Sequence, residues 1–309
     1  MNQSPLRIAT RKSALALWQA EHVAARLRLL VPERTVELVP LTTQGDRNLQ
    51  DSLAAIGGKG LFVKELEVAL AEGRADLAVH SMKDVPAELP DGFAIAAVLE
   101  REDPRDAFVS IRHASFTDLP QAARVGSSSL RRQCQLLYRR RDLRVSPLRG
   151  NVDTRLRKLA AGDYDAIILA VAGLKRLGLA DRITAKLELD ISLPAITQGV
   201  IGIECRSDDS ASRELTARLN HADTWQRTLA ERALNRALSG SCVVPLAGYA
   251  ELEAGQLHLR GRVGMPDGSR MIEGEIRGPA VQAETLGRTL AADMLARGAG
   301  EVLRHVAGA

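Results

Sequence analysis

The sequence has few aromatic residues and no long apolar run, and each shortage excludes something. Aromatic residues make up only 3% of the 309 residues, so we expect the hydrophobic cores to be aliphatic. No run of about twenty apolar residues occurs, and a membrane-spanning helix needs one. Residues 1–8 also lack the basic and apolar segments of a secretory signal. We therefore expect no membrane partner.

Cysteine is also scarce. The three cysteines lie far apart and form neither the CxxC pairs of a metal site nor a disulfide framework. Cys134 and Cys205 lie in apolar patterns that indicate inert core residues. Cys242 lies among small residues in a predicted loop, where its thiol is either reactive or merely structural. Unpaired cysteines are typical of a reducing compartment, so we expect a cytoplasmic protein.

Positive charge is present in excess, with a net charge of +4 and clustered arginines. Such clusters are typical of proteins that bind nucleic acid, phosphate or polycarboxylates. Residues 131–141 are the best candidate for nucleic acid, but apolar side chains interrupt them and only Tyr138 is suited to base stacking. We therefore expect an anionic small molecule and no nucleic acid. The histidines show no ligand spacing, so we expect no metal.

Predicted strands and helices alternate through the first two thirds of the chain, which is typical of an α/β fold. The expected strands are 7–10, 36–41, 75–79, 94–99, 106–110, 124–126, 145–148, 164–171 and 200–205. The expected helices include 14–30, 61–71, 210–220 and 223–238. A meander at 248–253, 257–264 and 270–276 follows, covered by a helix at 281–297. Polar segments at 100–105 and 194–199 predict hinges between two lobes that face a shared cleft.

Lys83 and Asp84 follow the apolar strand 75–79 and precede Pro86. Open α/β sheets bind ligands at the carboxyl ends of their strands. A cation and a carboxylate side by side at such an end predict a functional site. The alternative is a surface pair that only shapes a turn, because aspartate is common in turns.

A second candidate site lies at residues 127–132 (SSSLRR), where a helix is expected to begin. The unpaired N–H groups of a helix start bind anions. Arginines are electrostatically unfavourable there, so Arg131 and Arg132 predict a bound anion. The alternative is that both arginines face solvent. The expected buried face of this helix carries Leu130, Cys134, Leu137 and Tyr138.

The loop 57–60 contains three glycines around Lys59. Glycine permits backbone shapes that other residues resist, so the loop either presents Lys59 to a ligand or is a flexible connector.

Several long motifs resemble those of the porphobilinogen deaminase family, and they occur in the family's order. These motifs are 7–11 (RIATR), 57–67 (GGKGLFVKELE), 79–86 (VHSMKDVP), 128–133 (SSLRRQ), 148–152 (LRGNV) and 202–205 (GIEC). The resemblance covers about residues 6–250 and is weaker beyond them. It implies two α/β lobes like those of periplasmic binding proteins, with a hinged cleft, and a small C-terminal α+β domain with a three-stranded antiparallel sheet.

The resemblance also implies a reaction. Members of the family join four porphobilinogen molecules head to tail, release ammonia at each step and free a linear hydroxymethylbilane. A dipyrromethane cofactor is implied, held by a thioether to Cys242. Loss of ammonia leaves an electron-poor pyrrole cation, and the resemblance assigns its stabilisation to the Asp84 carboxylate. Each pyrrole carries an acetate and a propionate, which suit arginine's planar donors.

The resemblance assigns the remaining site residues to two groups. Cofactor binding is assigned to Cys242, Lys83, Asp84, Ser129, Arg131 and Arg132. Substrate binding is assigned to Arg11, Ser13, Lys59, Ser128, Arg149, Arg155 and Arg176. The chain departs from the family at 240–243, where the usual Gly-Gly-Cys-Gln reads GSCV, and also at Thr197 and Ala14. No departure removes a charged or nucleophilic group.

The expected domains are lobe 1 at 1–99 with 200–220, lobe 2 at 105–193, and the C-terminal domain at 222–309. We expect a monomer. A non-catalytic, two-lobed protein that binds a small anion is the main alternative, and it would leave Asp84 and Cys242 without roles.

Overall fold

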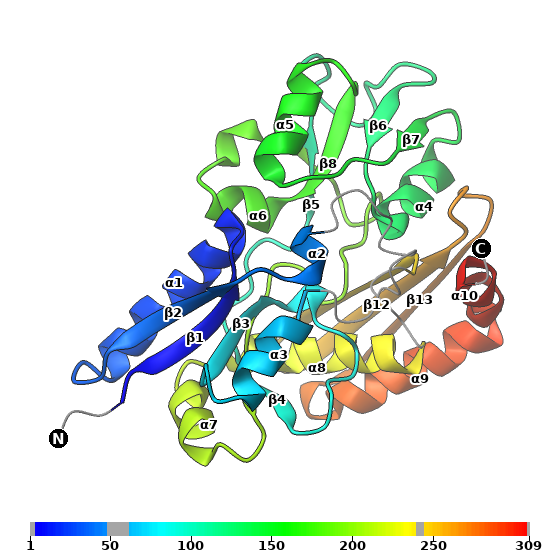
Figure 1. Ribbon diagram of the computed structural model, residues 1–309. Helices are drawn as coiled ribbons and strands as arrows, with labels where there is room; N and C mark the ends of the chain where they lie inside the picture. The colour runs from blue at the N-terminus through cyan, green and yellow to red at the C-terminus, as the bar shows by residue number, and fades with distance from the viewer. Residues whose placement is uncertain (1–3, 48–61, 239–243, 308–309) are drawn as a thin grey trace. The chain divides into compact units, whose positions relative to one another are not determined.

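The computed structural model describes residues 4–47, 62–238 and 244–307 (Figure 1). The chain divides into two compact units. Unit 1 comprises Met1–Glu102 with Val200–Trp225, and unit 2 comprises Asp103–Gly199 with Gln226–Ala309. A boundary between a second lobe and a C-terminal domain within unit 2 stays a prediction.

Unit 1 is built on a five-stranded sheet with the strand order β2-β1-β3-β10-β4. Its strands are β1 (Leu6–Arg11), β2 (Val36–Leu41), β3 (Leu77–Ser81), β4 (Phe93–Val98) and β10 (Ile201–Arg206). β1 pairs in parallel with β2 and β3, whereas β10 is antiparallel to β3 and β4. The predicted return of the 200–205 segment to the first sheet is confirmed.

Helices cover both faces of this sheet. The helices of unit 1 are α1 (Ala14–Leu30), α2 (Gln44–Arg47), α3 (Lys64–Ala71) and α7 (Ser210–Ala217). α1 buries residues at helical spacing, including Ala20, Val23 and Leu27, in a core with strand residues such as Ile8. α3 packs on the opposite face, because Leu66 and Leu70 share a separate core with Ala9 and Ala78.

Unit 2 contains a second five-stranded mixed sheet with the order β7-β6-β8-β5-β9. Its strands are β5 (Asp106–Val109), β6 (Arg124–Gly126), β7 (Arg144–Ser146), β8 (Ala166–Ala170) and β9 (Ala185–Lys186). Its helices are α4 (Leu130–Arg139), α5 (Val152–Ala160) and α6 (Val171–Arg176). β5 is antiparallel to β8, while β6 is parallel to β7 and β8.

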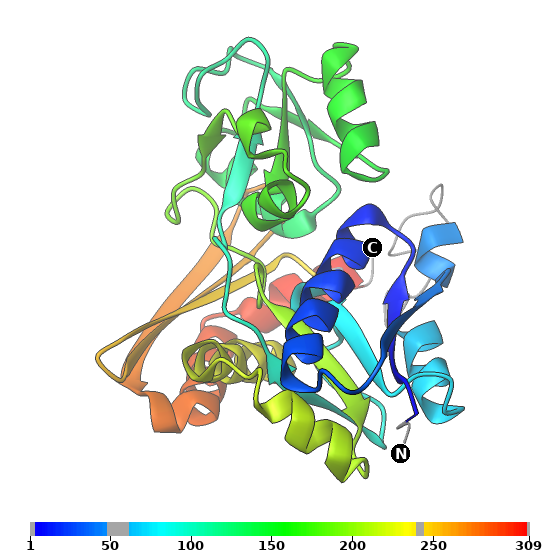
Figure 2. The ribbon, with the colours of Figure 1, turned by 90° about the vertical axis from the view of Figure 1, so that its left-hand side faces the viewer.

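A three-stranded antiparallel sheet follows in the order β11-β12-β13 (Figure 2). The elements are β11 (Leu246–Glu253), β12 (Gln256–Gly264), β13 (Met271–Pro279), α8 (Ala222–Ala237), α9 (Ala283–Ala296) and α10 (Ala299–Ala307). Leu234 of α8 and Met294 of α9 both approach Gly261 of β12, so the two helices share one face of the sheet. The predicted α/β class and the three-stranded antiparallel sheet are confirmed.

Two local expectations are wrong. β3 begins and ends two residues later than expected, so His80 and Ser81 are strand residues. α4 buries Cys134 of the predicted stripe, but Tyr138 is 42% exposed, and the buried residues of the helix include Arg131 and Arg132. Hydrophobicity alone predicts that the arginines of this helix face solvent. Arg131 and Arg132 are buried instead because the buried carboxylate of Asp106 compensates their charge. The short strand β9 and the helix α10 were not predicted.

Candidate active site

Unit 1 contains a pocket beside the carboxyl ends of β1 and β3. The two strands are parallel, with Ala9 opposite Ala78, so both end at the same edge of the sheet. The polar part of the pocket lining consists of Arg11, Ser13, Gln19, His80, Ser81 and Asp84. The pocket therefore brings a carboxylate, a guanidinium and several neutral donors to one strand-end position.

The 3₁₀ turn η1 (Met82–Asp84) follows β3 directly and carries Asp84, which is half-buried. Met82 is 1% exposed and anchors this turn. A Cβ atom at Gly202 would overlap the Met82 sulfur, so the bare backbone of β10 makes room for the anchor. The prediction that Asp84 follows a buried strand is confirmed, while its catalytic role stays a prediction.

Three contacts organise the pocket wall. The Ser13 hydroxyl caps α1 by accepting a hydrogen bond from the Ala16 N–H at 3.4 Å. The Gln19 amide donates to the Ser81 hydroxyl at 2.8 Å. The Arg11 guanidinium lies 4.1 Å from the centroid of the Phe62 ring, which is cation–π geometry. Gln19 and Phe62 were missed by sequence reasoning, because only the tertiary fold brings them beside β3.

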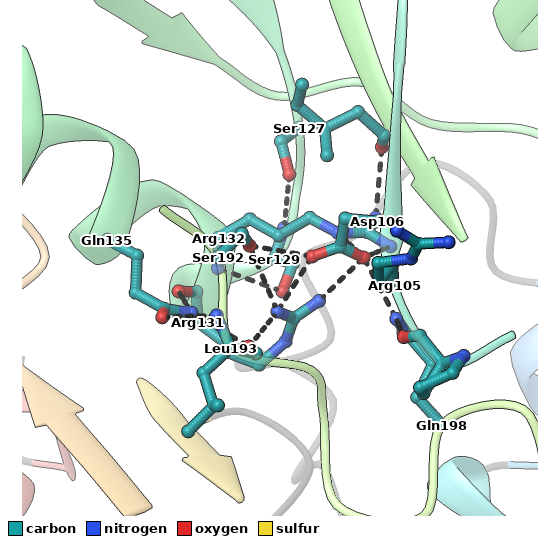
Figure 3. A network of polar contacts seen from close by, with 12 residues as sticks. Arg105, Asp106, Ser127, Ser129, Arg131, Arg132, Gln135, Ser192, Leu193 and Gln198 are labelled. Carbon is teal, nitrogen blue, oxygen red and sulfur yellow. Dashed lines mark hydrogen bonds and ion pairs between the residues drawn. The ribbon is translucent and has the colours of Figure 1, made fainter. Parts of the chain in front are cut away.

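Unit 2 holds a network around Asp106, the first residue of β5 (Figure 3). Asp106 is fully buried and pairs with Arg131 at 2.8 Å and with Arg132 at 2.7 Å. The Ser192 hydroxyl and the Gln198 amide also donate to this carboxylate, at 2.8 and 3.0 Å. Burial would raise the pKa of Asp106, but the charges of Arg131 and Arg132 outweigh burial and hold that pKa well below its usual range.

Both arginines make further bonds to backbone carbonyls. Arg131 donates to the Leu193 oxygen at 2.6 Å, and Arg132 donates to the Ile168 oxygen at 3.0 Å. Their side chains are 5% and 9% exposed, so neither faces bulk solvent. Asp106 thus supplies an internal anion for the arginine pair. Ser129 caps α4 by accepting from the Arg132 N–H at 3.4 Å.

The other predicted residues of unit 2 lie at strand and helix ends. Ser128 bonds the Leu148 backbone as both donor and acceptor, at 3.0 Å in each case. Arg155 on α5 donates to the Gly150 oxygen at 2.8 Å. Arg176, the last residue of α6, donates to the Gly199 oxygen at 2.7 Å.

For the remaining predicted site residues, the structure gives a position and an exposure. Arg149 follows β7 and is half-buried, and Lys83 is half-buried beside Asp84. The Asn151 side chain caps α5 by accepting a hydrogen bond from the Thr154 N–H. Lys59 and Cys242 lie outside the described residues.

Within residues 4–47, 62–238 and 244–307, no group of three acidic, histidine or cysteine side chains is arranged to hold a metal. No helix in those ranges is long and apolar enough to cross a bilayer.

Two sequence-family models match the chain and together cover most of it. Residues 6–214 match the porphobilinogen deaminase, dipyromethane cofactor binding domain. Residues 225–296 match the porphobilinogen deaminase, C-terminal domain.

Solved structures give more distant matches. The chain is 15% identical to the periplasmic VFT2 domain of BvgS from Bordetella pertussis, with a TM-score of 0.43 and coverage of 69% of this chain and 86% of that one. It is 14% identical to a periplasmic substrate-binding protein of an ABC transporter from Coxiella burnetii, with a TM-score of 0.43 and coverage of 69% and 91%. It is 16% identical to the aliphatic sulphonate binding protein SsuA from Escherichia coli, with a TM-score of 0.37 and coverage of 77% and 71%.

The two α/β sheets, the strand-end pocket and the cofactor-domain match together define a transferase of tetrapyrrole biosynthesis that uses a dipyrromethane cofactor. Its substrate is porphobilinogen and its product is hydroxymethylbilane. The chain belongs to the porphobilinogen deaminase family. This membership decides against the non-catalytic anion-binding alternative.

Proposed function

We propose that Asp84 is the carboxylate that stabilises positive charge while porphobilinogen units are joined. The supporting observation is that Asp84 and Arg11 line one pocket at the carboxyl ends of β1 and β3. A carboxylate so placed accepts hydrogen bonds from pyrrole N–H groups and favours the cation left when ammonia departs. It is also suited to hold and release a proton during the coupling. Arg11 would hold a substrate carboxylate beside it.

The donor set fits a dipyrromethane. Its acetate and propionate groups need cations and hydroxyls, and its N–H groups need an acceptor. The pocket of unit 1 offers Arg11, the hydroxyls of Ser13 and Ser81, and Asp84. When bound, the cofactor supplies the anchored primer to which substrate units are added. We assign its binding to Cys242, Lys83, Asp84, Ser129, Arg131 and Arg132.

In this proposal, Arg131 and Arg132 bind carboxylates of the ligand while each keeps its ion pair with the buried Asp106. Each guanidinium has five N–H donors, so one side can bond Asp106 while another bonds a ligand. We propose that substrate carboxylates are bound by Arg11, Ser13, Lys59, Ser128, Arg149, Arg155 and Arg176. We also propose a cytoplasmic location, since neither described thiol, Cys134 or Cys205, forms a disulfide, and we propose that the protein acts as a monomer.

Cys242 is the residue proposed to hold the cofactor, and the protein's other thiols provide a control. Burial raises the pKa of Cys134 to about 12 and that of Cys205 to about 11, so both stay protonated and weakly nucleophilic. Intact-mass spectrometry should find a two-pyrrole adduct on the wild type and on Cys134→Ala. Cys242→Ser should lack it. An adduct of unchanged mass on Cys242→Ser would reject the assignment.

Arg155 offers a test of substrate binding, because Arg157 lies on the same helix with its side chain exposed. A charge-assisted hydrogen bond contributes about 1.5–3 kcal/mol, which is roughly a 10- to 150-fold change in binding. Arg155→Ala should therefore accumulate an enzyme-bound chain of one length, seen by native gel or intact mass. Arg157→Ala should show the wild-type distribution. Equal behaviour of the two variants contradicts the role.

A further inference from the structure

Within unit 2, the three-stranded antiparallel sheet bonds to α4 through Arg262 of β12. Gly261, the residue before it, faces α8 and α9, so the Arg262 side chain leaves the sheet from the opposite face. Its Nη1 atom donates to the Oε1 atom of Gln135 on α4 at 3.0 Å. The same atom donates to the backbone oxygens of Leu189 and Asp190, at 3.1 and 2.8 Å. The Arg262 side chain is 14% exposed, so these bonds lie largely out of solvent.

Gln135 lies one helical turn after Arg131 and is 2% exposed (Figure 3). Its Oε1 atom accepts from the Leu193 N–H at 2.8 Å and from Arg262. Its Nε2 atom donates to the backbone oxygens of Arg131 and Leu193, at 3.0 and 3.1 Å. A glutamine amide has two acceptor lone pairs and two N–H donors, so these four bonds use its full capacity. A fully satisfied buried network is rigid and favours one geometry.

The same network reaches the Arg131 guanidinium. The Leu193 oxygen that accepts from Gln135 also accepts from the Nη1 atom of Arg131 at 2.6 Å. That oxygen and the Asp106 carboxylate together orient the guanidinium. Without the Arg262 donor, the Gln135 oxygen would lose one of its two bonds, and the Leu193 backbone would be held less firmly. A shift of the Leu193 oxygen would then move the guanidinium that bonds to it.

The turn at 265–270, between β12 and β13, contacts α4 independently. A Cβ atom at Gly268 would lie 2.4 Å from the Leu137 carbonyl carbon, so a side chain there would push the helix and the turn apart. The Gln133 amide also donates to the Pro266 oxygen at 3.2 Å. Gly255, in the turn between β11 and β12, has a similar left-handed backbone, with φ of +75° against +73° for Gly268. No described atom lies within 4 Å of a Cβ at Gly255, which makes it a matched control.

We propose that the β12–β13 hairpin positions the Arg131 guanidinium for a carboxylate of the dipyrromethane, and that Arg262 is the positioning residue that acts through Gln135. This rests on the proposed binding of the cofactor by Arg131. Arg262 acts on the ligand through Gln135 and Arg131, by fixing where the guanidinium lies. The three-stranded sheet thereby contributes to the formation of the holoenzyme.

The test measures the rate at which the two-pyrrole adduct forms, by intact mass, when porphobilinogen is added to full-length protein expressed without it. Arg262→Met keeps a long side chain but removes its donors. It should slow adduct formation by about 10- to 100-fold, since a misplacement of about 1 Å can cost a reaction about 100-fold. Arg260→Met is the control, because Arg260 lies on the same face of β12 but pairs with Glu251 of β11. This control should keep the wild-type rate.

Two further comparisons separate positioning from a general loss of stability. Arg131→Gln should itself slow adduct formation, and Arg262→Met added to it should cause little further slowing, because both changes act on one guanidinium. Gly268→Ala should slow adduct formation while Gly255→Ala, with the same backbone strain, should not. The glycine pair carries the test if Arg262→Met does not fold.

The outcomes distinguish this inference from the proposed function. Equal rates for Arg262→Met and Arg260→Met, or for the two glycine variants, would overturn the inference and leave a purely structural contact. Fully additive losses in the double variant with Arg131→Gln would also overturn it. Adduct formation at the wild-type rate in Arg131→Gln would instead overturn the proposed binding of the cofactor by Arg131.

Discussion

Asp84→Asn is expected to lower turnover of porphobilinogen by about 10²–10⁴, the range for a lost proton-transfer group. The variant keeps the shape and the hydrogen-bonding oxygen of the side chain but removes its charge. It therefore loses the stabilisation of the pyrrole cation, which arises only as ammonia leaves. The loss should appear in kcat, with a smaller change in KM.

Asp91→Asn is a suitable control for this measurement. Asp91 is exposed in the loop before β4, so its replacement removes an equal charge from unit 1 outside the pocket. Asp91→Asn should keep wild-type kcat. A comparable loss of kcat in both variants would mean that the net charge of the protein, and not the pocket carboxylate, affects the reaction.

Asp106→Asn is expected to lower the free energy of unfolding by about 3–5 kcal/mol, the usual cost of removing one partner of a buried ion pair. Asp106 is fully buried, and its loss leaves the guanidiniums of Arg131 and Arg132 without their counter-charge. Urea denaturation of both proteins measures this difference. Asp142→Asn, which breaks a partly exposed pair with Arg140, is the control and should change stability little.

The same residue predicts a pH dependence. Burial alone would raise the pKa of Asp106 above its ordinary value of 3.8. The positive charges of Arg131 and Arg132 outweigh burial and hold the folded-state pKa well below that value. Its stabilisation is therefore present above that ordinary value and is lost as pH falls toward the folded-state value. Wild-type stability should fall in acid more steeply than that of Asp106→Asn. Parallel curves for the two proteins would show that the buried carboxylate does not supply this stability.

Periodicity and strand-end reasoning located much of the fold. The helix 14–30 matches α1, because Ser13 is a side-chain cap and apolar residues recur at helical spacing. The sheet edge at Asp84 was also predicted, because a buried strand ends in polar residues before a proline. These features are local, and local rules of capping and burial are sufficient to find them.

Those local rules do not predict which residues that are distant in the sequence meet in the folded protein. Arg131 and Arg132 were recognised as needing an anion, but Asp106 lies 25 residues away from Arg131 in the sequence. The same applies to Glu204, which meets His80 across 124 residues. Hydrophobic periodicity treats charged side chains as exposed, so it misplaced the buried face of α4 and gave no sign of a buried His–Glu pair.

The Asp84 carboxylate is expected to act in the condensation on a primer that the protein already holds. Intact-mass spectrometry of wild type and Asp84→Asn, before and shortly after addition of porphobilinogen, tests it most directly. Wild-type protein should gain mass in steps of one pyrrole unit, while Asp84→Asn carrying the same two-pyrrole cofactor should stay at its starting mass. Step-wise growth of Asp84→Asn at the wild-type rate would contradict the claim.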